Sequence, residues 1–174
     1  MRSQSKVCGA VFVETSMSSY YFAIIGTRDN PVYELEFSSF KGAPSSQVVP
    51  GVSQFSASVK EILPFISHSS LDLIEDSQWT LNQFYLGKID LFYGLLVNAF
   101  ITQGNIKFVL CFDANGNTGP FPSSKNDDNS MKQFFSEAYD LYTKCLLNPF
   151  YSVNDAITSP DFDMRLKSLA RKYL

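Results

Sequence analysis

Hydrophobic positions along this chain fall into two patterns, one with the spacing of strands and one with the spacing of helices. Every residue from 20 to 25 is apolar, so neither face of this predicted strand can lie against water. A polar turn at 27–30 follows. After Pro31, the positions of Val32, Glu34 and Glu36 alternate with the apolar Tyr33, Leu35 and Phe37, which is typical of a half-solvated strand. These residues predict a β-hairpin whose first strand needs packed layers on both faces.

Residues 38–58 and 113–129 are rich in turn-forming residues and keep no period, so they predict long surface loops. Between the two loops, the chain first predicts an amphipathic helix that starts near Val59 and ends near Trp79. The buried stripe of this helix is expected to contain Ile62, Leu63, Ile66, Leu73 and Ile74.

Three strand patterns follow the helix, at 85–92, 94–101 and 106–112, with turn residues between them that indicate a meander. The second and third of these strands are apolar on both faces apart from Asn98 and Lys107. Two helices complete the chain. The earlier of these two helices is expected to be capped by Asn129 or Ser130, and the C-terminal helix has Ser159 as its N-cap.

The order of these segments predicts a three-layer α/β sandwich. Because a helical crossover joins the hairpin to the meander, the first and last strands are expected side by side at the centre of one mixed sheet. The first helix would cover one face and the last two helices the other. We expect a single domain over residues 20–174, preceded by a tail at 1–19, and translation of the natural protein is hypothesised to begin at Met17.

Composition excludes several classes of function. The chain has 174 residues and a net charge of −3, which provides no basic surplus for binding nucleic acid. The most apolar stretch, 91–112, contains several polar residues, so it does not read as a membrane span. The single histidine and the three cysteines at 8, 111 and 145 lack metal-ligand spacing, and this usage favours a reducing, cytosolic environment.

No arrangement of residues predicts catalysis. Asp113, Asn115 and Asn117 imitate the start of a calcium loop, but Thr118 and Ser124 stand where that loop needs glycine and an acid. The cysteines have no neighbouring base in the sequence pattern, and no glycine-rich phosphate loop is present. We therefore expect no catalytic residue, no cofactor and no metal site.

One predicted surface is a candidate for binding. On the arc of the first helix that faces away from its buried stripe, an aromatic ring lies among acidic residues: Glu61, Phe65, His68, Asp72, Glu75 and Asp76. The simplest interpretation is a solvated acidic face. The alternative is a protein-binding face with Phe65 as its anchor and Asp72 and Asp76 as selectors of a basic partner. A metal site is less favoured, since a convex exposed face lacks supporting ligands.

Several segments together resemble the sedlin family, the small subunits of the TRAPP vesicle-tethering complex. The resemblance runs from residue 20 to 174 with gaps at the two long loops, and it depends on YYFAIIGTRDNPVYELEF, LPFISHSSLDLIEDSQW, YLGKIDLFYG, LYTKCLLNPFY and SPDFDMRLKSLARKYL. Residues 1–19 and the two loops depart from the family pattern, so nothing is carried over to them.

The resemblance implies a longin-like fold, with a five-stranded sheet between one helix and two. It also implies a non-catalytic subunit of TRAPP, an assembly that promotes nucleotide exchange on a Rab GTPase in ER-to-Golgi transport and autophagy. The family lies at one end of the TRAPP core and links it to larger subunits, with Asp72 at the position of functional importance. Localisation in the cytoplasm, peripheral at cis-Golgi and endoplasmic reticulum membranes, is expected.

Other classes remain open at this point. A small subunit of a vesicle coat adaptor would share the fold, and only the motif matches argue against it. A SNARE regulatory head is expected to continue into a heptad-patterned coiled coil and a membrane anchor, whereas this sequence ends at Leu174. An enzyme is the third class, and loss of an activity on replacing a cysteine or His68 would favour it.

Overall fold

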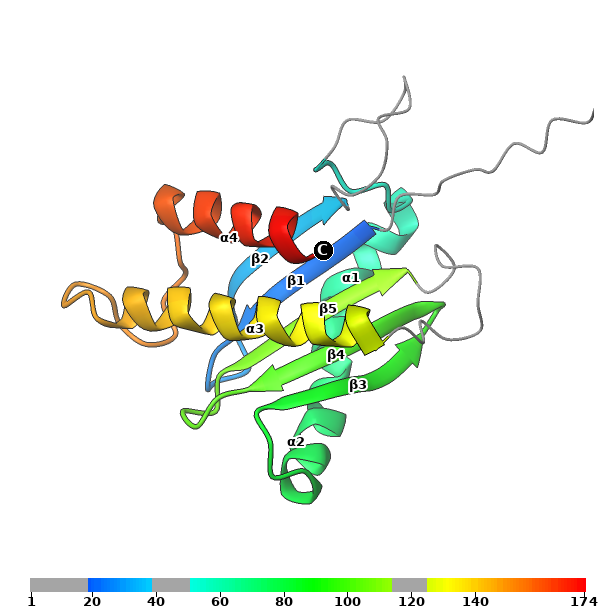
Figure 1. Cartoon of the computed structure of the whole chain (residues 1–174), viewed down its shortest axis with the longest axis horizontal. Helices are drawn as coiled ribbons and strands as arrows, with labels where there is room; N and C mark the ends of the chain where they lie inside the picture. Colours follow the sequence, from blue (N-terminus) through cyan, green and yellow to red (C-terminus); the bar gives the residue numbers. More distant parts are fainter. Residues whose placement is uncertain (1–18, 39–50, 114–124) are drawn as a thin grey trace, which may run out of the picture.

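One antiparallel sheet lies between two layers of helices (Figure 1). The computed structural model describes residues 19–38, 51–113 and 125–174. The strands are β1 (Ser19–Ile25), β2 (Pro31–Ser38), β3 (Tyr85–Phe92), β4 (Leu95–Ile101) and β5 (Lys107–Asp113). The helices are α1 (Ala57–Ser69), α2 (Leu71–Thr80), α3 (Lys125–Leu146) and α4 (Pro160–Tyr173). This is the three-layer arrangement of a longin-like fold.

The strand order is β2-β1-β5-β4-β3, and each neighbouring pair is antiparallel. The expected adjacency of the first and last strands is confirmed, because β1 pairs with β5 along most of its length. The expectation of a mixed sheet is wrong. The helical crossover joins β2 at one edge to β3 at the other, so the two strands that it makes parallel are never neighbours.

The central strands are buried on both faces, as their continuous apolar runs predict. Alternate side chains of β1 enter two separate clusters: Phe22 packs with α3 and α4, whereas Ala23 packs with α1 and α2. Every residue of β1 and β4 is buried. The two clusters explain why neither strand can carry the alternating polar pattern of a one-sided sheet.

The first predicted helix is interrupted at Ser70, which divides it into α1 and α2 on the same face of the sheet. Its predicted buried stripe is correct at Leu63, Ile66 and Ile74 but wrong at Leu73, which is exposed. α2 packs near the edge of the sheet against β3 and β4, so it buries only a narrow stripe.

The second predicted helix starts earlier than its capping pattern indicates. α3 begins at Lys125 rather than after Asn129 or Ser130, so part of the predicted loop 113–129 is helical. Hydrophobic spacing starts only at Met131, which is buried, and the polar residues at 125–130 give no periodic signal in the sequence. Asn115, Asn117 and the other residues of 114–124 lie outside the described residues, as do Cys8 and the tail before Ser19.

The turn between β1 and β2 is fixed by the distant α3–α4 connection. The side-chain oxygen of Asn154 accepts a hydrogen bond from the backbone N–H of Thr27 at 2.7 Å, and Asn30 donates to the Asn154 carbonyl at 2.9 Å. A Cβ on Gly26 would lie 2.2 Å from the same Asn154 oxygen. The close approach requires glycine and holds the turn, including Asp29, in place.

Both edges of the sheet are interrupted. β3 has register shifts between Tyr85 and Gly87 and between Lys88 and Asp90, which twist its outer edge. On β2, the carbonyl of Val32 accepts a hydrogen bond from the backbone N–H of Ile157 at 2.8 Å, and Pro31 has no N–H to donate. Among the described helices, none is long and apolar enough to cross a membrane.

Candidate protein-binding surface

The outward face of α1 and α2 carries all six side chains that the sequence predicts as a partner-binding group. All six are exposed: Glu61, Phe65, His68, Asp72, Glu75 and Asp76. Phe65 is the unusual member, since 65% of it is accessible although a phenyl ring gains free energy from burial. The outward placement is confirmed, and binding of a partner at this face stays a prediction.

Among the acids of this surface, Glu75 is the one that forms an ion pair within the described residues. The side chain of Lys107, at the start of β5, points to the α2 side of the sheet and is only 1% exposed. Its Nζ lies 2.6 Å from Oδ1 of Asp29 and 3.3 Å from Oε1 of Glu75. Glu75 therefore compensates a buried charge, which leaves Asp72 and Asp76 as the acids of α2 available to a partner.

An apolar groove of about 440 Å³ lies beside Phe65. Its walls come from α1 and from the turn between β3 and β4, and its lining is Ser58, Val59, Ile62, Phe65, Phe92 and Tyr93. Tyr93 and Gly94 both have positive φ, 51° and 77°, the geometry of a tight hairpin turn. Sequence reasoning missed Phe92 and Tyr93, although two adjacent aromatic residues before a turn glycine were a usable signal.

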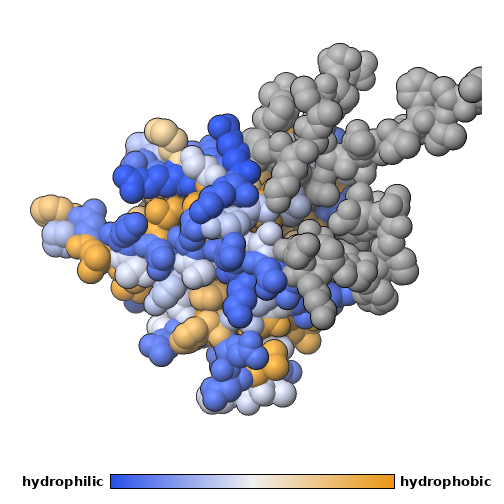
Figure 2. Space-filling model, in the orientation of Figure 1, coloured by the Kyte–Doolittle hydropathy of each residue, from blue (hydrophilic) through white to orange (hydrophobic). Residues whose placement is uncertain are grey.

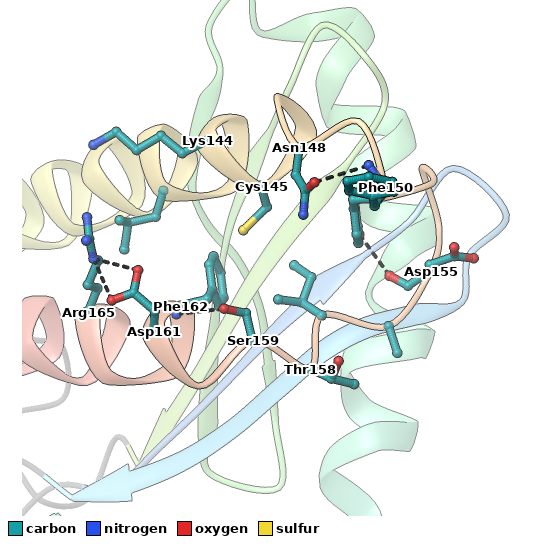
Figure 3. A pocket seen from close by; sticks show the side chains of 14 residues that line it. Lys144, Cys145, Asn148, Phe150, Asp155, Thr158, Ser159, Asp161, Phe162 and Arg165 are labelled. Atoms are coloured by element: carbon teal, nitrogen blue, oxygen red, sulfur yellow. Dashed lines mark hydrogen bonds and ion pairs between the residues drawn. The ribbon is translucent and has the colours of Figure 1, made fainter.

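A second groove, of about 480 Å³, lies between the end of α3 and the start of α4 (Figure 3). Cys145 points into it, and an ion pair between Asp161 and Arg165 (Nε–Oδ2 3.0 Å) lies on its α4 side. Beside it, Phe150 is 95% exposed, and Figure 2 shows hydrophobic atoms at the protruding tip of this connection.

The two described cysteines, Cys111 and Cys145, are not activated as nucleophiles. Burial raises the pKa of the Cys111 thiol to about 12, and burial followed by the nearby Asp161 carboxylate raises the pKa of Cys145. Both thiols are therefore protonated at neutral pH, and a protonated thiol is a poor nucleophile. Within the described ranges, no three His, Cys, Asp or Glu side chains converge to hold a metal ion.

Comparison with known proteins identifies the family. The sequence profile described as Sedlin matches residues 24–172. This chain belongs to the sedlin family. The match includes β2 to β5 and α1 to α3 in full, α4 except its last residue, and only the last two residues of β1. It includes all six residues of the predicted surface.

Three relatives match along nearly their full length. "Trafficking protein particle complex subunit 20" of Saccharomyces cerevisiae is 39% identical, covering 88% of this chain and 97% of that protein. "Transport protein particle 20 kDa subunit" of Schizosaccharomyces pombe is 38% identical, covering 88% and 98%. "Probable trafficking protein particle complex subunit 2" of Drosophila melanogaster is 36% identical, covering 91% and 99%.

The sedlin match confirms the resemblance based on the sequence motifs. The three-layer sandwich predicted from strand burial is the arrangement that the structure shows. The motif SLDLIED, residues 70–76, forms Ser70 and the first turns of α2, and the structure places its Asp72 on the exposed face.

Proposed function

We propose that this chain is a non-catalytic subunit of a trafficking protein particle complex that acts in vesicle transport. The observation that carries the proposal is the full-length similarity to three sedlin relatives whose names all describe subunits of such a particle. The protonated thiols and the exposed aromatic among carboxylates also favour a binding role over a chemical one.

Within that role, the outward face of α1 and α2 is proposed to bind a larger subunit and connect it to the core of the particle. An exposed aromatic ring supplies a binding anchor, and carboxylates that form no ion pair within the described residues attract a basic surface. The proposal extends to ER-to-Golgi transport and autophagy, and to a cytoplasmic protein that reaches cis-Golgi and endoplasmic reticulum membranes through its complex.

Replacing Asp72 by Ala is expected to weaken capture of a larger particle subunit and to leave folding nearly intact. Asp72 is exposed on α2, and exposed substitutions usually change the free energy of unfolding by less than about 0.5 kcal/mol. Affinity capture from native extract, with identification of the co-purifying proteins, measures the first effect, and thermal unfolding measures the second.

The matched control is Asp140→Ala, an exposed aspartate on α3 in the opposite helical layer. Capture that is equal for the Asp72 variant and the parent would contradict the assignment of this face. A co-purifying set of coat-adaptor subunits instead of particle subunits would favour the alternative of a coat adaptor.

The purified chain alone is expected not to accelerate nucleotide release from a Rab GTPase. Exchange requires a surface that inserts into the nucleotide pocket, and we propose that other subunits of the assembly provide it. Release of a fluorescent nucleotide from Rab proteins of the early secretory pathway, with and without the chain, tests this. A dose-dependent increase in the release rate would show that the chain has exchange activity of its own.

A further inference from the structure

Two exposed aromatic residues flank Asp72 at equal spacing on α1 and α2. Phe65 precedes it by seven residues and Trp79 follows it by seven. Trp79 is 85% exposed, and at 100° per residue it falls on the same outward arc as Phe65 and Asp72. We call the outward line Phe65, Asp72, Asp76 and Trp79 the ridge.

The ridge follows one nearly continuous helical path despite the interruption at Ser70. The backbone N–H of Ser70 bonds to the Ile66 carbonyl at 3.1 Å, and the N–H of Ile74 bonds to the Ser70 carbonyl at 3.0 Å. Figure 1 shows α1 and α2 following each other across the back of the sheet. With a rise of 1.5 Å per residue, the fourteen steps from Phe65 to Trp79 span about 21 Å.

Each aromatic residue lies at its own groove. Phe65 lines the groove of about 440 Å³ beside the β3–β4 turn. Trp79 lines another, of about 430 Å³, at the far end of α2. Exposed Leu81 and Phe84 and the amide side chains of Asn82 and Gln83 lie around the second groove. The ridge therefore ends in an aromatic side chain beside a concave surface at both ends.

The charge along the ridge has one sign. Within the described part of the chain, neither Asp72 nor Asp76 forms an ion pair. Lys60 of α1 is paired with Glu36 at 3.1 Å, and the buried Lys107 is paired with Asp29 and Glu75. A complementary partner must carry positive charge between two apolar contacts.

We propose that the ridge binds a basic amphipathic helix of a partner protein, with Phe65 and Trp79 as its two aromatic anchors. The inference rests on the proposed function and names the chemistry of the partner at that face. An extended peptide would find no free backbone groups on a helical surface, whereas a helix satisfies its own hydrogen bonds. A partner helix packed nearly parallel to α1 and α2 would contact residues spaced seven apart, which is the spacing of Phe65, Asp72 and Trp79.

Trp79 is the only tryptophan in the chain, so its fluorescence reports directly on one anchor. The probes are two tryptophan-free helical peptides of about 21 residues, with leucine at heptad positions and either lysine or glutamate flanking them. The full-length chain is titrated with each peptide. The lysine peptide is expected to bind and shift Trp79 emission to shorter wavelength, and the glutamate peptide is expected not to bind.

Variants assign the binding to the ridge. Phe65→Ala and Trp79→Ala, measured by anisotropy of a labelled lysine peptide, are each expected to weaken binding about tenfold or more. Phe150→Ala, which removes an exposed ring on the α3–α4 connection, is the matched control and is expected to bind as the parent does. Asp72→Lys with Asp76→Lys is expected to reverse the preference between the two peptides.

Several outcomes would overturn the proposal. These are equal binding of both peptides, binding without a change in Trp79 emission, an equal loss with Phe150→Ala, or a concentration-dependent dimer that Trp79→Ala abolishes. The peptide test is independent of capture of the particle. If Asp72→Ala leaves capture unchanged while the lysine peptide binds as expected, the proposed function of this face fails and the helix-binding ridge stands.

Discussion

Replacing Asp29 by Asn and Glu75 by Gln in the same chain is expected to lower the free energy of unfolding by about 3 kcal/mol. The two changes remove the carboxylates at 2.6 Å and 3.3 Å from Nζ of Lys107, which is 1% exposed. A buried ammonium group without a counter-charge has lost its hydration without a compensating ion pair, which is unfavourable. Because the amide oxygens can still accept a hydrogen bond, the expected loss lies at the low end for an uncompensated buried charge.

Urea denaturation of the parent and the double variant measures this loss, and an unchanged dependence on denaturant shows that both unfold in the same way. Asn suits position 29 because it tolerates the positive φ of 56° found there. The control is the same double variant with Lys107→Met, which removes the buried charge and is expected to regain most of the stability. A double variant as stable as the parent would contradict the argument.

Replacing Phe22 by Ala is expected to lower the free energy of unfolding by about 3–5 kcal/mol. Phe22 lies in β1, is fully buried, and its ring packs edge-on against Phe134 with centroids 5.3 Å apart. It also contacts the rings of Phe108 and Phe135, so its removal leaves a cavity that three rigid side chains cannot fill. For a domain with a total stability of about 5–15 kcal/mol, this is a large part.

Phe150→Ala removes the same side chain from an exposed position and is expected to change stability by less than about 0.5 kcal/mol. The comparison separates loss of packing from loss of the residue itself. Chemical denaturation of both variants under one set of conditions is sufficient. A loss below about 1 kcal/mol for Phe22→Ala would show that the α3 and α4 side of the core is not tightly packed.

The layering of this fold could be predicted from the sequence because burial of a strand on two faces leaves a direct trace. The unbroken apolar run from 20 to 25 excludes a one-sided sheet, and the pairing of β1 with β5 follows from placing two such strands at the centre. The start of α4 was equally readable, since the Ser159 side chain accepts from the backbone N–H of Phe162 and Pro160 follows it.

The errors occur where the structure depends on contacts between distant segments. Nothing in the local pattern shows that α2 meets the sheet near its edge, which exposes Leu73. The start of α3, at 125–130, contains no apolar residue, so it has no hydrophobic period to detect. Lys107 looked like an interruption in an apolar strand, and only the fold brings Asp29 and Glu75 to it from 78 and 32 residues away.

The candidate surface was predicted in part for the same reason. A helical wheel needs only local geometry, so the exposure of Phe65 and Asp72 could be read from the sequence. The groove beside Phe65 needs the β3–β4 turn, which a wheel does not contain. The sequence predicted Trp79 at the end of the helix but gave it no role. The groove beside it is built partly from the β4–β5 turn, whose position the helical pattern does not contain.

The interrupted edges of the sheet bear on the fate of newly made copies that have not yet entered an assembly. A continuous outer strand is a template on which identical chains stack. The two register shifts of β3 and the contact of Ile157 with β2 remove that template on both sides. Surplus copies are therefore expected to remain dispersed and competent for incorporation, rather than to accumulate as aggregates.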